Sequence, residues 1–317
     1  MAQQIKDPGI GEKFNARSGR VMNKDGSFNV RHSGWSFSRI HLFQYLIGVS
    51  WLQFNFILFI AFVITNMLYA CLYLSMGDGA LQNAASAGVT RFWDAVFFSA
   101  HTLTTVGYGN IYPMGFAANI VSATEAMTGL LGFAVATGLV YGRFSRPTAK
   151  MEYSKSAIIA PYHNKNALMF RIANARASLL MELHADVTFT YVEKLGDQFI
   201  RKYFLLPLER DNILYLSLSW TLVHPINEHS PLYNKTRKQL EDMKIEILVK
   251  LKGYDEGYGE HVHARFSYLL EDIVWGAKFL PTFHVADDGA TVLDYNHISS
   301  YVKAELNPDY HAHVQGS

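Results

Sequence analysis

Two long apolar runs constrain the fold of this chain more than any other feature, because each can cross a lipid bilayer. The runs extend from Val49 to Leu74 and from Phe116 to Tyr141. About 20 residues of α-helix cross a hydrocarbon core of about 30 Å. The second run contains one charged side chain, Glu125, which must face protein or water. A buried helix of a soluble protein is the alternative, but it rarely runs this long without a charge. We therefore expect two membrane-spanning helices.

The composition of the 317 residues agrees with a chain that lies partly in lipid. Hydrophobic residues make up 50% and charged residues 17%, against about a quarter charged in soluble proteins. A formal net charge of +1 gives no indication of nucleic acid as a partner. Cys71 is the only cysteine, which excludes a disulfide within the chain and favours a reducing compartment.

The distribution of basic residues predicts how the two helices cross the membrane. Basic residues flank the outer sides of the pair: Arg31, Arg39 and His41 precede the first run, and Arg143, Arg146 and Lys150 follow the second. The intervening segment offers Arg91 against Asp78 and Asp94. The positive-inside rule therefore places both termini in the cytoplasm. Residues 1–34 are polar and are expected to form a cytoplasmic tail.

The segment before the first run mixes aromatic, apolar and basic side chains. It extends from Trp35 to Leu46 (WSFSRIHLFQYL). This mixture is typical of a short amphipathic helix on the inner membrane surface. An ordinary lead-in turn is the alternative on periodicity alone.

A short apolar stretch and a glycine-containing loop lie between the two runs. Phe92 to Leu103 is too short to span and is interpreted as a re-entrant helix, followed by TTVGYG from Thr104 to Gly109. Such a loop is allowed at membrane depth only where protein buries it or water fills a pore.

The TTVGYG loop has the residues that a potassium filter needs. Successive carbonyls replace the hydration shell of K⁺, and glycine permits the unusual backbone angles that direct them inward. The filter residues are expected to be Thr105, Val106, Gly107, Tyr108 and Gly109, with Val106 and Tyr108 packed behind the carbonyls. Four chains are required, because one strand covers only a quarter of each ion. The alternative is a glycine turn in an unrelated membrane protein.

Several further motifs occur in a fixed order after the second run. They are Arg143–Pro147 (RFSRP), Arg171–Arg176, Trp220–Tyr233, Ala264–Tyr268 and Ile273–Phe279. With TTVGYG, they make the chain similar to the inward-rectifier potassium channel family, most of all its prokaryotic branch, from about Trp35 to about Tyr301. The resemblance implies a homotetrameric, multi-pass, potassium-selective channel in the plasma (inner) membrane of a prokaryote.

The C-terminal half is predicted to be all-β from its residues alone. The segments Ala167–Ile172, Asp186–Val192, Ile213–Leu222 and Ile245–Leu251 are rich in β-branched and aromatic residues and are separated by turn-like stretches. This pattern suggests a sandwich, and the resemblance implies an immunoglobulin-like one that extends the pore. We therefore divide the chain into a tail (1–34), a pore domain with its interfacial helix (35–147) and a cytoplasmic β-sandwich (148–317).

One stripe of the second apolar helix contains two candidate gates. Phe133, Thr137 and Tyr141 are spaced by four residues, which on spacing alone favours a helix contact face. By resemblance, Phe133 occupies the cavity position that controls blocker binding, and Tyr141 lies near the inner helix-bundle crossing. Rings at either level would close a pore by dewetting and bulk. Gly138 provides either a hinge or close helix packing.

Two sites in the C-terminal half follow from the resemblance. Gly257, Tyr258 and Gly259 match the girdle loop at the top of the cytoplasmic pore; without the resemblance they would be a hairpin loop. Glu182 matches a cytoplasmic pore acid that attracts cations and polyamines; otherwise it is a solvated surface charge.

The chain departs from the family pattern at four positions. Phe133 replaces an acidic cavity residue, and Lys252 stands where another pore acid is found, which argues against strong polyamine-dependent rectification. His101 and Ile111 replace a glutamate and an arginine that form an ion pair behind the filter in eukaryotic members. We hypothesise that Glu125 approaches His101 instead.

Basic residues after the second run are candidates for lipid binding. Arg143, Arg146 and Lys150 match a region that binds phosphoinositide headgroups in relatives, and each would contribute about 1 kcal/mol of attraction to anionic lipid. The alternative is that these basic residues only determine the direction in which the helices cross the membrane. By resemblance, we expect modulation by lipid, which opens eukaryotic relatives and inhibits bacterial ones; the sequence does not decide between the two signs, and we favour inhibition. K⁺, Ba²⁺ and polyamines are the expected permeant or blocking ions.

Two other classes of protein are the alternatives. A ligand-gated two-span potassium channel of another class would need a nucleotide-binding constellation, and voltage gating would need an arginine-repeat helix; neither pattern is found. A membrane-tethered metalloenzyme would use histidine pairs such as His261/His263 and His311/His313, but no pattern completes a zinc site. We expect no enzyme activity, no cofactor and no metal other than K⁺ at the filter.

Overall fold

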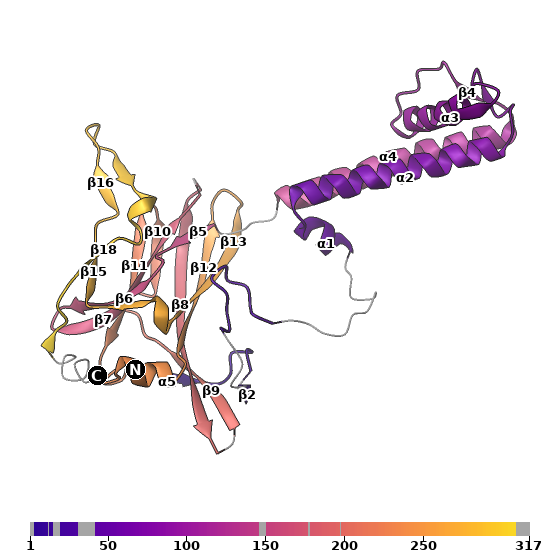
Figure 1. The fold of residues 1–317 in the computed structure, drawn as a ribbon. Helices are drawn as coiled ribbons and strands as arrows, with labels where there is room; N and C mark the ends of the chain where they lie inside the picture. The colour runs from indigo at the N-terminus through magenta and orange to yellow at the C-terminus, as the bar shows by residue number, and fades with distance from the viewer. Residues whose placement is uncertain are drawn as a thin grey trace. The chain divides into compact units, whose positions relative to one another are not determined.

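The computed structural model describes residues 3–11, 13–14, 20–30, 42–145, 150–176, 178–196 and 198–308 (Figure 1). The chain divides into two compact units. One, the membrane unit, comprises residues 33–146, and the other, the β unit, comprises residues 1–32 and 147–317. Each unit is described by itself.

The described residues of the membrane unit form four helices, of which α2 (Trp51–Ser75) and α4 (Phe116–Phe144) are long enough to cross a membrane and lie side by side (Figure 1). Their apolar windows have mean hydropathies of 2.2 and 1.4. Ser50 caps α2 by accepting the Gln53 N–H, while the Gln53 side chain accepts the Ser50 N–H. Because most apolar side chains of both helices are exposed in the single chain, lipid or other subunits must cover them.

Two shorter helices complete the membrane unit. α1 (Leu42–Gly48) precedes α2, and α3 (Gly88–Leu103) lies between α2 and α4. The amphipathic helix predicted from Trp35 therefore has a described part that begins at Leu42, and residues 35–41 lie outside the described residues. α3 packs on α2 through Tyr73 and Phe98, whose rings meet edge to face at 5.1 Å. β3 (Leu81–Gln82), between α2 and α3, pairs with β4 (Tyr112–Pro113), between α3 and α4, as a short antiparallel ribbon.

The β unit is built from two sheets that enclose one apolar core (Figure 1). The larger sheet has the order β1 (Gln3–Ile5), β9 (Gln198–Leu205), β8 (Leu180–Leu195), β12 (Glu246–Asp255) and β13 (Glu260–Leu269), with β2 (Lys13–Phe14) on β9 and β10 (Asn212–Leu216) on β8. The smaller sheet has the order β11 (Ser219–Ile226), β7 (Lys165–Asn174), β6 (Ala157–Tyr162) and β14 (Ile273–Trp275), with β5 (Met151–Tyr153) on β7. All pairs are antiparallel except β14 with β6.

The core between the sheets follows from the alternation of side chains along the strands. In β11 every second residue is buried, so that Leu222 packs into the core while its neighbours face outward. Phe170 of β7, Phe189 of β8 and Phe266 of β13 belong to the same cluster. The prediction of two apolar helices followed by an all-β domain is thereby confirmed.

Smaller elements lie at the ends of the sheets. They are α5 (Arg237–Asp242), the strand pairs β15 (Ala277–Phe279) with β18 (Tyr301–Lys303) and β16 (Phe283–Val285) with β17 (Thr291–Leu293), and two 3-10 turns at Leu270–Asp272 and Tyr295–His297.

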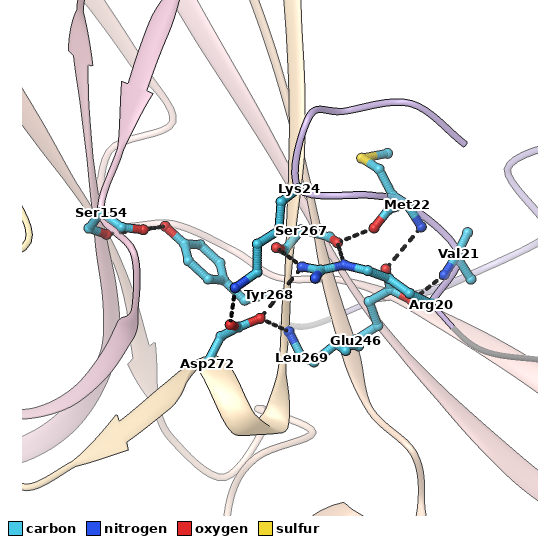
Figure 2. A network of polar contacts seen from close by, with 10 residues as sticks. All are labelled: Arg20, Val21, Met22, Lys24, Ser154, Glu246, Ser267, Tyr268, Leu269 and Asp272. Atoms are coloured by element: carbon cyan, nitrogen blue, oxygen red, sulfur yellow. Dashed lines mark hydrogen bonds and ion pairs between the residues drawn. The ribbon is translucent and has the colours of Figure 1, made fainter. Parts of the chain in front are cut away.

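The N-terminal segment packs on the β unit rather than forming a separate tail. Besides the pairing of β1 and β2 with β9, Arg20 and Lys24 contact the end of β13 and the turn that follows it (Figure 2). Arg20 Nη2 donates to the Ser267 carbonyl at 2.5 Å, and Lys24 Nζ lies 2.6 Å from Asp272 Oδ1. The Glu246 carboxylate accepts two backbone N–H groups of this segment. The tail predicted for residues 1–34 does not include these contacts, because the side-chain partners of residues 20–24 lie more than 200 residues along the chain, beyond any local pattern.

Candidate functional site

The loop that follows α3 has an unusual backbone. Thr105, Gly107 and Gly109 have positive φ angles of 61°, 54° and 80°, whereas Val106 and Tyr108 between them do not. Positive φ is strained for threonine and free for glycine. All five residues are exposed in the single chain. We call residues 104–109 the filter loop.

The filter loop is hydrogen bonded to the last turn of α3. The His101 carbonyl accepts the N–H groups of Val106 at 2.9 Å and of Gly107 at 3.2 Å, and Thr105 N donates to Thr102 O at 3.0 Å. The Tyr108 ring meets the His101 ring edge to face, with centroids 4.8 Å apart. The position of the loop is therefore set by the position of α3.

An apolar groove of about 620 Å³ lies beside the start of the filter loop. Its walls come from α2 and α4, and Thr104, Thr105 and Phe133 contribute to its lining. Phe133 is 74% exposed and Tyr141, two turns further along α4, is 73% exposed. Neither candidate gate residue is buried in the single chain, and no described residue covers either ring.

Gly138 lies between the two candidate gates in an uninterrupted helix. α4 is continuous from Phe116 to Phe144, and a Cβ atom at Gly138 would have no atom within 4 Å. Packing within the subunit therefore does not require a glycine here. In contrast, a Cβ at Gly142 would lie 3.3 Å from Ile47 of α1, so that glycine allows α1 to approach α4.

Glu125 is wholly buried at the junction of three helices. Its Oε2 accepts the Tyr73 hydroxyl of α2 at 2.7 Å, and its Oε1 contacts the Ser99 hydroxyl of α3. The hypothesis that Glu125 approaches His101 is wrong, because Glu125 is partnered by these hydroxyls and the His101 ring packs on Tyr108. Sequence reasoning missed Tyr73 and Ser99. One available signal was the polar stripe Asn66, Tyr69 and Tyr73 along the otherwise apolar α2.

Arg143 is engaged within the membrane unit. Its guanidinium donates to the carbonyls of Leu46 at 2.5 Å, Ile47 at 3.1 Å and Val49 at 2.6 Å. It also lies 4.6 Å from the Trp51 ring centroid. The interaction holds the end of α1 against α4. Headgroup binding at Arg143 stays a prediction.

Arg146 and Lys150 are the other two candidates for lipid binding. Arg146 lies outside the described residues. Lys150 is exposed, and its carbonyl accepts the Ala175 N–H. Headgroup binding at both residues stays a prediction.

The candidate girdle loop is a tight connection between β12 and β13. Gly259 has a φ of 67° and donates its N–H to the Asp255 carbonyl at 2.9 Å, and the Gly257 N–H donates to Asp255 Oδ1. The Tyr258 hydroxyl accepts a hydrogen bond from Arg176 at 2.5 Å. Because Asp255 is wholly buried, the loop has a fixed conformation in the β unit.

The two candidate pore charges lie on neighbouring strands of the larger sheet. Glu182 of β8 has a φ of 49° at an irregularity in the pairing with β12. Lys252 of β12 is exposed, between His184 of β8 and His263 of β13. The structure places both residues on strands of one sheet, without bringing them together as an ion pair, and their place in a pore stays a prediction.

Histidines do not form a metal centre in the part of the chain that the structure describes. No three metal-ligating side chains come together there. His261 instead meets the Tyr254 ring edge to face at 5.7 Å. His311 and His313 lie outside the described residues.

Two apolar helices long enough to cross a membrane flank a short helix and a glycine-containing loop, and an all-β unit follows; this order of elements fits a two-span membrane channel. Comparison with known families agrees with this class. Residues 56–146 match the ion channel model, and residues 151–316 match the inward rectifier potassium channel C-terminal domain.

Sequence identity to individual channels shows the family to which the chain belongs. The chain is 38% identical over 291 residues to the inward rectifier potassium channel Kirbac3.1 of Paramagnetospirillum magnetotacticum, with 90% of this chain and 96% of that protein covered. It is 28% identical over 327 residues to the ATP-sensitive inward rectifier potassium channel 15 of Mus musculus, with 95% and 85% covered. The G protein-activated inward rectifier potassium channel 4 of Mus musculus is 27% identical over 310 residues, with 87% and 71% covered. The chain belongs to the inward rectifier potassium channel family, whose members are ion channels and not enzymes.

Proposed function

We propose that the chain is one subunit of a homotetrameric, potassium-selective channel that conducts K⁺ passively through the inner membrane of a prokaryote. In this arrangement α3 is the re-entrant pore helix and residues Thr105–Gly109 coordinate K⁺. Both termini and the β unit lie in the cytoplasm. Membership of the family supports this function over a ligand-gated two-span channel of another class.

The alternating backbone of the filter loop is the observation that carries the proposal. In an extended strand successive carbonyls point to opposite sides, whereas alternation of the sign of φ directs them toward one side. The filter loop alternates in this way, because φ is positive at Thr105, Gly107 and Gly109 and not at the residues between them. A ring of four such loops would surround an ion with carbonyl oxygens. The C-terminal end of α3 adds its partial negative charge beside Thr104.

The exposure of the Phe133 and Tyr141 side chains supports a gate at each of these two levels of the pore. Phe133 and Tyr141 present their rings outside the subunit, so four copies at either level can narrow and dewet a shared axis. The absence of atoms near the Gly138 Cβ position favours a hinge over a packing role within the subunit. The Gly257–Gly259 loop is proposed as a second constriction, at the cytoplasmic side.

Anionic or phosphoinositide headgroups are proposed to bind at Lys150 and Arg146 and to inhibit the channel. Arg143 contributes indirectly, by fastening α1 to α4, because its guanidinium already contacts three carbonyls. Lys252 and Phe133 disfavour cationic polyamine blockers, whereas Ba²⁺ is expected to block at the filter.

The test is ion flux through the purified full-length protein in liposomes. We expect Ba²⁺-blocked flux that favours K⁺ and Rb⁺ over Na⁺, from particles whose native mass corresponds to four chains. Gly107→Ala is the matched variant, because a side chain at a φ of 54° strains the loop, and it should abolish selective flux. Unselective wild-type flux, or a mass that four chains do not explain, would contradict the proposal.

A further inference from the structure

The end of α3 and the middle of α4 meet at two matched points. Ser99 and Leu103 lie one turn apart on α3, and Glu125 and Gly129 lie one turn apart on α4. The Ser99 hydroxyl contacts the Glu125 carboxyl, and a Cβ atom at Gly129 would lie 1.9 Å from the Leu103 carbonyl oxygen. α4 therefore supports the turn of α3 from which the filter loop begins.

The contact at Ser99 belongs to a buried polar group of four side chains from all three helices, here called the Glu125 cluster: Asn66, Tyr73, Ser99 and Glu125. Each is at most 3% exposed. No Lys, Arg or His nitrogen lies within ion-pairing distance of Glu125 among the described residues. An isolated charge at such a site is costly, because neither lipid nor protein solvates it.

Counting hydrogens in the cluster distinguishes the two protonation states of Glu125. Ser99 Oγ lies 3.2 Å from both Asn66 O and Asn66 Oδ1, and it also contacts Glu125 Oε1. Asn66 Nδ2 is used on the Phe62 carbonyl, so the Oδ1 of the same amide faces Ser99 as an acceptor. The Asn66 carbonyl already accepts an N–H within α2, so with an ionised Glu125 one hydroxyl hydrogen would serve two remaining acceptors, Glu125 Oε1 and Asn66 Oδ1. With a neutral Glu125, the carboxyl hydrogen goes to Ser99 Oγ and the Ser99 hydrogen goes to Asn66.

We propose that Glu125 is a neutral carboxylic acid and the positioning residue that holds α3, and through the His101 carbonyl the filter loop, in its selective geometry. Hydrogen bonds then run in one direction, from Tyr73 to Glu125 Oε2 and from Glu125 Oε1 through Ser99 to Asn66. Among the described residues no ion pair joins α3 to the filter loop, so these neutral bonds carry the alignment. The functional half of this inference rests on the proposed function; the protonation half does not.

Infrared spectroscopy of the reconstituted full-length protein tests the protonation state directly. The difference spectrum between wild type and Glu125→Gln at neutral pH should show the C=O stretch of a protonated carboxyl. Ser99→Ala should shift that band to higher frequency, because the carboxyl loses a hydrogen-bond acceptor. A carboxylate band in place of the carboxyl band would overturn the inference whether or not the protein conducts.

Selectivity tests the positioning role. Gln retains one donor for Ser99 and one acceptor for Tyr73, so Glu125→Gln should keep the ratio of K⁺ to Na⁺ flux within about twofold of wild type. Glu125→Ala and Ser99→Ala should lower the ratio by about tenfold or more, since each breaks a buried hydrogen bond. The two substitutions combined should lower it no further than either alone.

Two controls separate positioning from folding. Thr124→Ala alters the neighbouring α4 residue, whose hydroxyl donates to the Val121 carbonyl of its own helix, and should leave the ratio unchanged. Native mass and thermal unfolding identify the variants that assemble. If assembled Glu125→Ala and Ser99→Ala keep wild-type selectivity, or if Glu125→Gln loses it, the positioning role is wrong. If wild type itself is unselective, the proposed function fails instead.

Discussion

His224 lies inside the β unit with both ring nitrogens satisfied in the neutral state. Nδ1 donates to the Pro207 carbonyl at 2.7 Å, and Nε2 accepts from the Ser230 hydroxyl at 2.8 Å. The side chain is 1% exposed, and this burial lowers the pKa of His224 from its ordinary 6.5 to about 4. Protonation would remove the bond from Ser230 and place a charge in the core.

This lowered pKa predicts a loss of stability in acid. Between pH 6.5 and 4 the unfolded chain binds a proton that the folded chain does not, so the stabilisation is complete above pH 6.5 and is lost as the pH falls toward 4. The loss is on the order of 3 kcal/mol in the free energy of unfolding. Denaturant unfolding across this pH range measures it. His224→Gln should flatten the profile, whereas His229→Gln, at an exposed position, should not; equal profiles for wild type and His224→Gln would contradict the assignment.

The contacts of Arg143 predict that lysine cannot replace arginine at this position without a loss of stability. Its planar guanidinium contacts three carbonyls of residues 46–49, and a lysine ammonium lacks the fork that reaches them together. Arg143→Lys should therefore lower stability by about 1–3 kcal/mol and increase proteolysis near α1, although the charge is kept. Lys150→Arg is the matched control and should change neither. Unchanged melting of Arg143→Lys in detergent would show that charge alone suffices.

Elements that follow from local pattern were predicted well. The apolar runs 49–74 and 116–141 correspond to α2 at Trp51–Ser75 and α4 at Phe116–Phe144, because apolar length is a property of the run itself. The helix expected from Phe92 begins at Gly88. The partners of Glu125 were not predicted, since Tyr73 and Ser99, on two other helices, become its neighbours only through packing. The pairing of residues 3–5 with β9 was missed for the same reason.

The N-terminal segment depends on one glycine for its approach to β13. Gly26 has a φ of 81°, and a Cβ atom there would lie 2.2 Å from the Arg265 carbonyl oxygen. Gly26→Ala should displace the segment and abolish protection of the Val21 and Met22 amides from hydrogen exchange. Gly9→Ala is the control, because Gly9 also has a positive φ (94°) but no atom within 4 Å of its Cβ position. Retained protection in Gly26→Ala would show that the segment is held without this close approach.

For the assembled molecule, Lys252 predicts a salt-dependent effect on conduction. If the exposed face of β12 lines a cytoplasmic pore, four lysines repel entering cations. Lys252→Glu should then raise K⁺ conductance, and more at low ionic strength, because salt screens charges over about 10 Å at 0.1 M. Single-channel recording across salt concentrations measures the effect. Lys238→Glu, at an exposed position of α5, should have none, and an equal effect of both variants would place Lys252 outside the pore.

The packing of the N-terminal segment on the β unit also has a consequence for biosynthesis. Arg20 contacts Ser267, which is synthesised 247 residues later. At about 5–20 residues per second, the segment waits on the order of tens of seconds for its partner. During that interval both apolar helices leave the ribosome, so membrane insertion precedes closure of the β unit. The N-terminal strand β1 gains its partner β9 before Arg20 and Lys24 gain Ser267 and Asp272, so strand pairing becomes available to the nascent segment earlier than these side-chain contacts.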